Sequence, residues 1–113
     1  EDTRVGGMYL KNPAIAKRWN DGALDVVDAL TDYVKQRGGT TLSRFALAWV
    51  AAQPGITSPI IGPRTMEQFD DNMAAFELKL TDEDMAAVDA IVPRGQMVSP
   101  FYEADFGPHL HRI

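Results

Sequence analysis

The segment that most constrains the fold of this chain is Ile56–Ile61, a short, largely apolar run that predicts a β-strand with Pro59 near its start. It is the one convincing strand candidate among several helical segments. A single strand cannot satisfy its own backbone amides and carbonyls, and even an isolated pair of strands is marginal in water. Either this segment is an extended connector, or its strand partners lie outside these residues. We favour the second interpretation.

The helix predicted from Leu42 to about Gln53 supports that interpretation. Residues 46–52 read Ala-Leu-Ala-Trp-Val-Ala-Ala and are apolar all round the helix, so we expect it to be buried on several sides. The other predicted helices do not readily supply that many neighbours. Because the chain also opens with a loop-like segment and without Met, we expect it to begin inside a larger domain.

Helical periodicity and helix-end signals predict four further helices, over 12–19, 21–37, 66–75 and from Thr81 to Pro93. In the last three, apolar residues recur at steps of three or four, and we expect them to face inward. These residues are Leu24, Val27, Leu30 and Val34, then Met66, Phe69 and Met73, and finally Met85, Val88, Ile91 and Val92. Adjacent acids are expected on solvated helix faces and first turns: Asp70, Asp71, Glu83 and Asp84.

The residues after the strand candidate have the chemistry of an anion site. Gly62-Pro63 makes a tight turn that leads into Arg64, and Thr65 and Gln68 have the spacing of a capping box. The free amides and dipole at the start of a helix favour negative charge, and a guanidinium can bind a phosphate through two hydrogen bonds. Asn72 lies one turn beyond Gln68 and can line the same side. From these residues alone, a solvated arginine and a plain helix cap stay open as alternatives.

Composition excludes several classes of protein and site. The net charge of −5 and the pI of about 4.8 argue against general affinity for nucleic acid or for a membrane surface. The absence of cysteine excludes disulfides and thiolate metal sites. No apolar run approaches the roughly 18 residues of a membrane span. His109 and His111 lack a carboxylate cluster that would complete a metal site, and no set of residues makes a complete catalytic constellation.

The stretch 45–65, followed by Glu67-Gln68 and Asn72, closely resembles the C-terminal part of the aldo-keto reductase family, especially its bacterial members. The pattern ALAWV…QPG.TSPI.G.RT.EQ…N is highly specific to that family. The resemblance continues through the helix opened by Thr81 and into the tail at 99–109, and extends more loosely back to 22–37. It covers, in effect, the whole chain.

The resemblance implies an α/β fold, because the family is built as a (β/α)8 barrel. Residues 1–113 look like the last third of one such barrel domain, mostly helical with one barrel strand. In order, they would supply the loop after strand 7, helix 7, strand 8 at about Thr57–Ile61, a cofactor-binding helix at 66–75, helix 8 and the tail.

The resemblance also implies a function, the NADPH-dependent reduction of aldehydes and ketones to alcohols. Arg64 would contact the 2′-phosphate of the adenosine, with Gln68 near the same phosphate or its ribose. Asn72 would approach the adenine amino group, and Asp71 is a further candidate for the adenine edge. The implied cofactor-binding residues are Gly62, Arg64, Thr65, Gln68, Asp71 and Asn72.

The tyrosine, lysine, aspartate and histidine that act in the family belong to earlier strands, so no catalytic role is carried over to this chain. The expected partners are a small carbonyl substrate and the remainder of the same barrel, in a cytoplasmic protein that binds neither nucleic acid nor membrane. The alternative is a non-catalytic helical module, free-standing or regulatory, derived from the same barrel.

Overall fold

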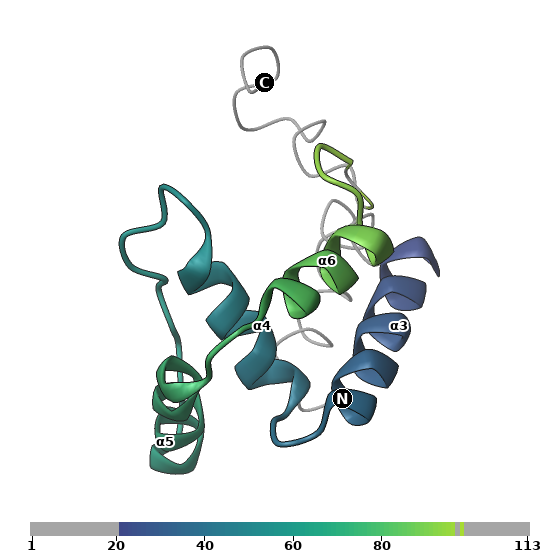
Figure 1. The fold of residues 1–113 in the computed structure, drawn as a ribbon. Helices are drawn as coiled ribbons and strands as arrows, with labels where there is room; N and C mark the ends of the chain where they lie inside the picture. Colours follow the sequence, from purple (N-terminus) through teal and green to yellow (C-terminus); the bar gives the residue numbers. More distant parts are fainter. Residues whose placement is uncertain (1–20, 97, 99–113) are drawn as a thin grey trace, which may run out of the picture. The chain divides into compact units, whose positions relative to one another are not determined.

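The computed structural model describes residues 21–96 and 98, and that part of the chain consists of helices and loops (Figure 1). The elements are α3 (Asp21–Arg37), α4 (Leu42–Ala52), α5 (Met66–Ala74), the 3-10 helix η1 (Ala75–Glu77) and α6 (Asp82–Ile91). The four helices predicted over these residues are therefore confirmed, with ends within one or two positions of those expected. The helix predicted at 12–19 and the tail at 99–109 lie outside the described residues.

The described residues belong to two compact units, one of which is Ala29–Ile91. Residues 21–28, 92–96 and 98 belong to the other unit. The core, the ion pairs and the capping hydrogen bonds lie within Ala29–Ile91. That unit contains the C-terminal part of α3 and all the later helices.

Side-chain caps explain why three of the helices begin where they do. The Thr41 hydroxyl accepts a hydrogen bond from the Arg44 amide at the start of α4. Thr65 caps α5 in the same way, and the Thr81 hydroxyl accepts from the amide of Asp84 at the start of α6. Each cap satisfies one of the amides that the first turn of a helix leaves without an intrahelical partner.

Gly38 ends α3 through a backbone conformation that favours glycine. Its φ is +72°, in the left-handed region, and its amide donates to the Val34 carbonyl at 3.0 Å. The predicted end of this helix at residue 37 is thus confirmed.

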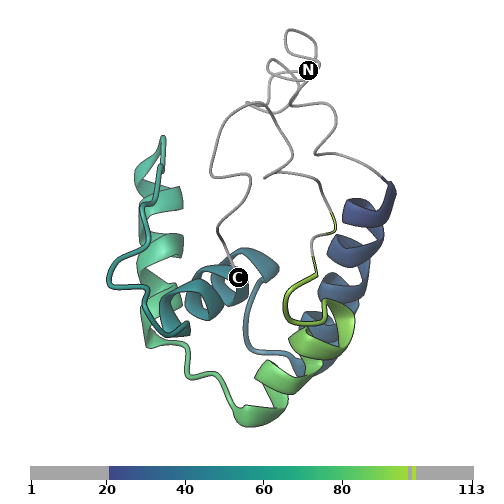
Figure 2. The same cartoon turned by 90° about the horizontal axis from the view of Figure 1, so that it is seen from above.

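A small core joins α3, α4 and α6. Val34, Phe45 and Val88 are buried together, and six partly buried apolar residues pack around them: Leu30, Tyr33, Leu42, Trp49, Leu78 and Leu80. The Tyr33 and Phe45 rings meet edge to face with centroids 5.9 Å apart. α4 packs against α5 and η1, whereas α6 lies against the last turns of α3 (Figure 2).

One acid that was expected on a solvated face is buried. Asp84 is 2% exposed, and its carboxylate accepts from the Tyr33 hydroxyl at 2.8 Å, from Arg37 Nε at 2.7 Å and from the Thr81 amide at 2.8 Å. The prediction was wrong because those partners offset the cost of taking the charge out of water. The Arg37 guanidinium is the main cause that holds the pKa of Asp84 well below its usual range.

The structure does not confirm the predicted strand. Residues 57–61 form an irregular connection between α4 and α5, and no strand occurs in the part of the chain that the structure describes. Ile60 is fully exposed. A strand exists through its hydrogen bonds to a neighbour, and this segment has no neighbouring strand among residues 21–96 and 98.

Two predictions about inward faces are also corrected. Met66, Phe69 and Met73 of α5 are exposed, Met66 by 71%, and so are Leu24 and Val27 of α3. α4 is buried at Phe45 and Ala48 and half-buried at Leu47, Trp49 and Ala51, but it is exposed at Ala46, Val50 and Ala52. Periodicity identifies the apolar face of a helix, but burial needs a second element to cover that face. Within the described residues no element covers the outer faces of α4 and α5.

Candidate functional site

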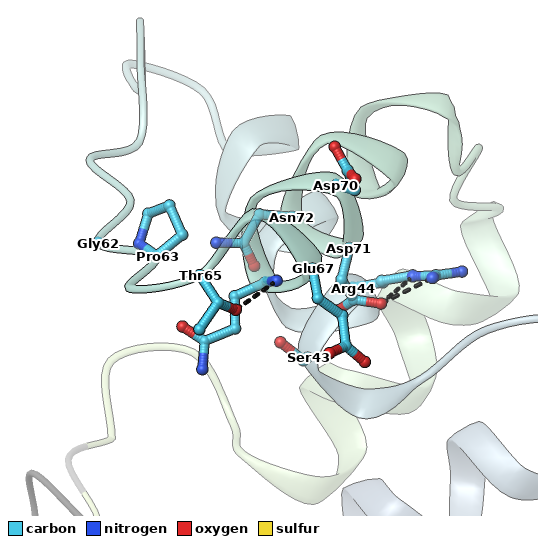
Figure 3. Close-up of a pocket in the computed structure, with 10 residues that line it drawn as sticks. Ser43, Arg44, Gly62, Pro63, Thr65, Glu67, Asp70, Asp71 and Asn72 are labelled. Atoms are coloured by element: carbon cyan, nitrogen blue, oxygen red, sulfur yellow. Dashed lines mark hydrogen bonds and ion pairs between the residues drawn. The ribbon is translucent and has the colours of Figure 1, made fainter.

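The turn before α5, the body of α5 and the first turn of α4 surround an open pocket of about 1100 Å³ (Figure 3). Its lining residues are Ser43, Arg44, Gly62, Pro63, Thr65, Glu67, Gln68, Asp70, Asp71 and Asn72. Five of the six predicted site residues belong to that lining, and the sixth, Arg64, does not. All of them lie within Ala29–Ile91, so one compact unit contains the whole pocket.

The start of α5 has the capping geometry that the Thr65 and Gln68 spacing predicts, with one difference. The Thr65 hydroxyl accepts from the Gln68 amide at 3.2 Å, as in a capping box. In return, Gln68 Oε1 accepts from the backbone amide of Arg64 at 2.8 Å, one residue before the cap. Gln68 therefore holds the turn to the helix, and its Nε2 donors remain available to a ligand.

Arg64 is exposed, and its guanidinium has no ion pair or hydrogen bond within the described residues. Arg37 and Arg44, by contrast, each pair with a carboxylate, Asp84 and Asp71 respectively. The Arg64 side chain is thus an unpaired cation beside the amino end of a nine-residue helix. A charge in that position is free to pair with an anionic ligand.

Arg44 and Asp71 join α4 to α5 at the edge of the pocket. Arg44 Nε and Nη2 both lie 2.7 Å from Asp71 Oδ1 (Figure 3). Each side chain is about one-third exposed, so the pair is worth only about 0–1 kcal/mol to stability. Asp71 Oδ2 has no partner among residues 21–96 and 98.

The remaining charges of the lining are acidic. Glu67, Asp70 and Asp71 come from α5, and the one basic side chain in the lining is Arg44. Figure 3 shows Asp70 pointing away from Thr65 and Asn72. A phosphate bound here would need Arg64 and the helix amides, because the other charges of the pocket oppose it.

Gly62 leaves room beside this turn. A Cβ built on Gly62 would meet no atom within 4 Å, so glycine is not required there by packing within the described structure. The open space adjoins Pro63 and Thr65 and forms part of the pocket wall.

Sequence reasoning missed Ser43, Arg44, Pro63, Glu67 and Asp70 as pocket residues. Arg44 is the most informative of them, and it lies 27 residues from its partner Asp71. Local spacing carries no signal for such a pair, since it depends on how α4 and α5 pack. The capped start of α4 at Thr41 would have placed Arg44 in the first turn and no more.

Residues 21–96 and 98 contain no group of three or more side chains that could hold a metal ion. Likewise, none of the helices described is long and apolar enough to cross a membrane.

Comparison with known proteins defines the class to which this fold and pocket belong. The model of the aldo/keto reductase family matches residues 4–93. The chain belongs to the aldo/keto reductase family, as the sequence pattern predicted, and that membership implies a (β/α)8 barrel.

Individual relatives agree with the family. An uncharacterized oxidoreductase of Bacillus subtilis, YrpG, is 40% identical over 67 residues, which are 59% of this chain and 20% of the relative. A Saccharomyces cerevisiae protein with the provisional name aryl-alcohol dehydrogenase is 25% identical over 93 residues, 82% of this chain and 61% of the relative. A second yeast protein with the same provisional name is 31% identical over 107 residues, 81% of this chain and 28% of the relative. The chain therefore spans between 20% and 61% of the length of these relatives.

Proposed function

We propose that this chain is the C-terminal part of an NADPH-dependent aldo-keto reductase that reduces aldehydes and ketones to alcohols. In that proposal the pocket at the start of α5 binds the adenosine end of the cofactor. The observation that supports it most is the Arg64 guanidinium, which is unpaired within the described residues and stands beside the capped amino end of α5.

The pocket residues fit that part of the cofactor. Arg64, which lies between the lining residues Pro63 and Thr65, would pair with the 2′-phosphate, and the Nε2 of Gln68 would donate to the same phosphate or to the ribose. Asn72 lies in the lining one helical turn further on, where an amide can bond the adenine edge. Gly62 and Thr65 form the wall between the turn and the helix. The acidic lining is compatible with this arrangement provided the phosphate stays at Arg64, outside the acid-lined part.

When bound, NADPH supplies the hydride for the carbonyl carbon of the substrate. On this proposal the role of this chain is to bind the adenosine half of the cofactor, because none of its residues lies in the family's catalytic motifs. The proton donor belongs, on this proposal, to earlier strands of the barrel.

The remainder of the barrel is the proposed partner of the exposed apolar faces. Ile60, Met66, Phe69 and Met73 are large, exposed and close together in sequence, in the connection 57–61 and in α5. A soluble protein rarely leaves such a surface uncovered. Preceding strands and helices of a (β/α)8 barrel would pair with 57–61 and cover α5.

The test uses the complete polypeptide, meaning the one that carries these residues together with the rest of the barrel. Fluorescence titration should show binding of NADPH in preference to NADH, and a panel of carbonyl substrates should show NADPH oxidation. Failure to bind either nucleotide would overturn the proposal. Binding without turnover of any carbonyl would instead support the non-catalytic module.

A further inference from the structure

The Arg44–Asp71 pair stands out among the ion pairs of the described structure because both partners line the pocket. The Lys35–Asp32 pair is a long surface contact of 3.7 Å within α3, and Arg37–Asp84 is buried away from the pocket. Arg44 belongs to α4 and Asp71 to α5. A residue of one helix therefore holds a pocket side chain of the other.

Arg44 binds only one of the two carboxylate oxygens of Asp71. Arg44 places two nitrogens on Oδ1 of Asp71, each at 2.7 Å. The second oxygen, Oδ2, has no partner within the described residues. A carboxylate held in this way has a fixed orientation and one acceptor left for a ligand N–H group.

Charge gives the pair a second effect. The pocket lining holds the carboxylates of Glu67, Asp70 and Asp71, and an anionic ligand would be repelled by each that lacks a counter-charge. Arg44 supplies that counter-charge to Asp71, the carboxylate whose Oδ2 can also accept a hydrogen bond. Without Arg44, Asp71 would be both free to rotate and uncompensated.

We infer that Arg44 is a positioning residue that acts through Asp71, orienting its carboxylate to accept a hydrogen bond from the exocyclic amino group of a bound adenine nucleotide. This inference rests on the proposed function and adds the residue that sets base recognition at the same site. Arg44 itself makes no contact with the nucleotide on this view.

The experiment measures Kd for NADPH and for its hypoxanthine analogue, in which a carbonyl oxygen replaces the adenine amino group. The variants, made in the complete polypeptide, are Arg44→Ala, Arg44→Lys, Asp71→Ala and the double variant Arg44→Ala/Asp71→Ala. Lys35→Ala is the matched control, because it removes an exposed cation that does not line the pocket. The melting temperature of each variant reports whether it is folded.

The wild type should bind NADPH about tenfold more tightly than the hypoxanthine analogue, as the loss of one hydrogen bond to a charged group implies. Arg44→Ala should lower that preference several-fold, and Arg44→Lys should keep more of it. The double variant should bind NADPH no more weakly than Asp71→Ala, because a residue that acts only through Asp71 has no effect once Asp71 is gone. Lys35→Ala should behave as the wild type.

Retention of the full adenine preference in Arg44→Ala would overturn the inference, and so would equal binding of both nucleotides by the wild type. A double variant that binds more weakly than Asp71→Ala would do the same, because Arg44 would then act on the ligand directly. In these cases NADPH still binds and the proposed function stands. Failure of the wild type to bind any nicotinamide dinucleotide overturns both.

Discussion

Arg37 and Asp84 lie 47 residues apart in sequence, yet Arg37 Nε and Asp84 Oδ1 are 2.7 Å apart. The contact is shielded, since Asp84 is 2% exposed and Arg37 also stacks over the Phe45 ring at 5.9 Å. Arg37 Nη2 donates to the Lys79 carbonyl at 3.1 Å as well. The Arg37 guanidinium therefore links the end of α3 to the first turn of α6 and to the segment before it.

We expect Arg37→Ala to lower the free energy of unfolding by about 3–5 kcal/mol, because it leaves a buried carboxylate without its counter-charge. Chemical denaturation of the complete polypeptide, monitored by circular dichroism, measures this. Lys35→Ala, two residues earlier on the exposed face of α3, should leave the free energy unchanged. Equal stability of Arg37→Ala and the wild type would mean that solvent reaches Asp84.

The Asp84 carboxylate also predicts that the free energy of unfolding falls at acidic pH, which gives the stability curve an acid limb. The Arg37 guanidinium is the main cause that depresses the pKa of Asp84 in the folded protein, so protons bind the unfolded state more tightly. Its stabilising contribution is complete above the unfolded pKa, about 3.9, and is lost progressively as the pH falls below that value.

Asp84→Asn should flatten this acid limb. The comparison is of unfolding midpoints for the wild type and Asp84→Asn between about pH 5 and pH 2, where the wild type should lose stability faster. Parallel curves for the two proteins would contradict the assignment.

Arg64 gives the prediction closest to function. Arg64→Ala should weaken NADPH binding by about 2 kcal/mol, roughly 30-fold, and change NADH binding little. The expected loss is at the low end of the range for charge pairs because Arg64 is exposed. The measurement is the ratio of the two dissociation constants. Equal losses for NADPH and NADH would remove the 2′-phosphate from the assignment.

The exposed apolar face of α5 predicts how these 113 residues behave alone. With Met66, Phe69 and Met73 uncovered, we expect the isolated chain to melt without a cooperative transition or to self-associate. Circular dichroism on heating and light scattering measure the two outcomes. A cooperative melt of a monomer would count against dependence on further barrel strands.

Helix positions were predictable because their signals are local. Thr41, Thr65 and Thr81 each bond an amide three residues ahead, and Gly38 supplies the left-handed residue that ends α3. The family pattern was readable for a similar reason, since its residues are consecutive from 45 to 65. Five of the six predicted site residues line one pocket because they lie on one turn and one helix.

The features that the sequence did not predict depend on contacts between distant parts of the chain. The burial of Asp84 follows from Tyr33 and Arg37, which are 51 and 47 residues away. The orientation of Asp71 follows from Arg44 on another helix. The strand at 57–61 is not confirmed, because pairing is a property of two segments and one sequence segment cannot specify it alone.

The hydrogen bond from the Arg64 amide to Gln68 Oε1 fixes the backbone of that arginine and leaves its side chain unrestrained. Its backbone is fastened to the first turn of α5 before any ligand arrives, while its guanidinium remains in water. A ligand that pairs with the guanidinium then has side-chain rotamers to immobilise and little of the loop to order. If the proposed cofactor binds here, its exchange would require movement of one side chain and little rearrangement of the turn.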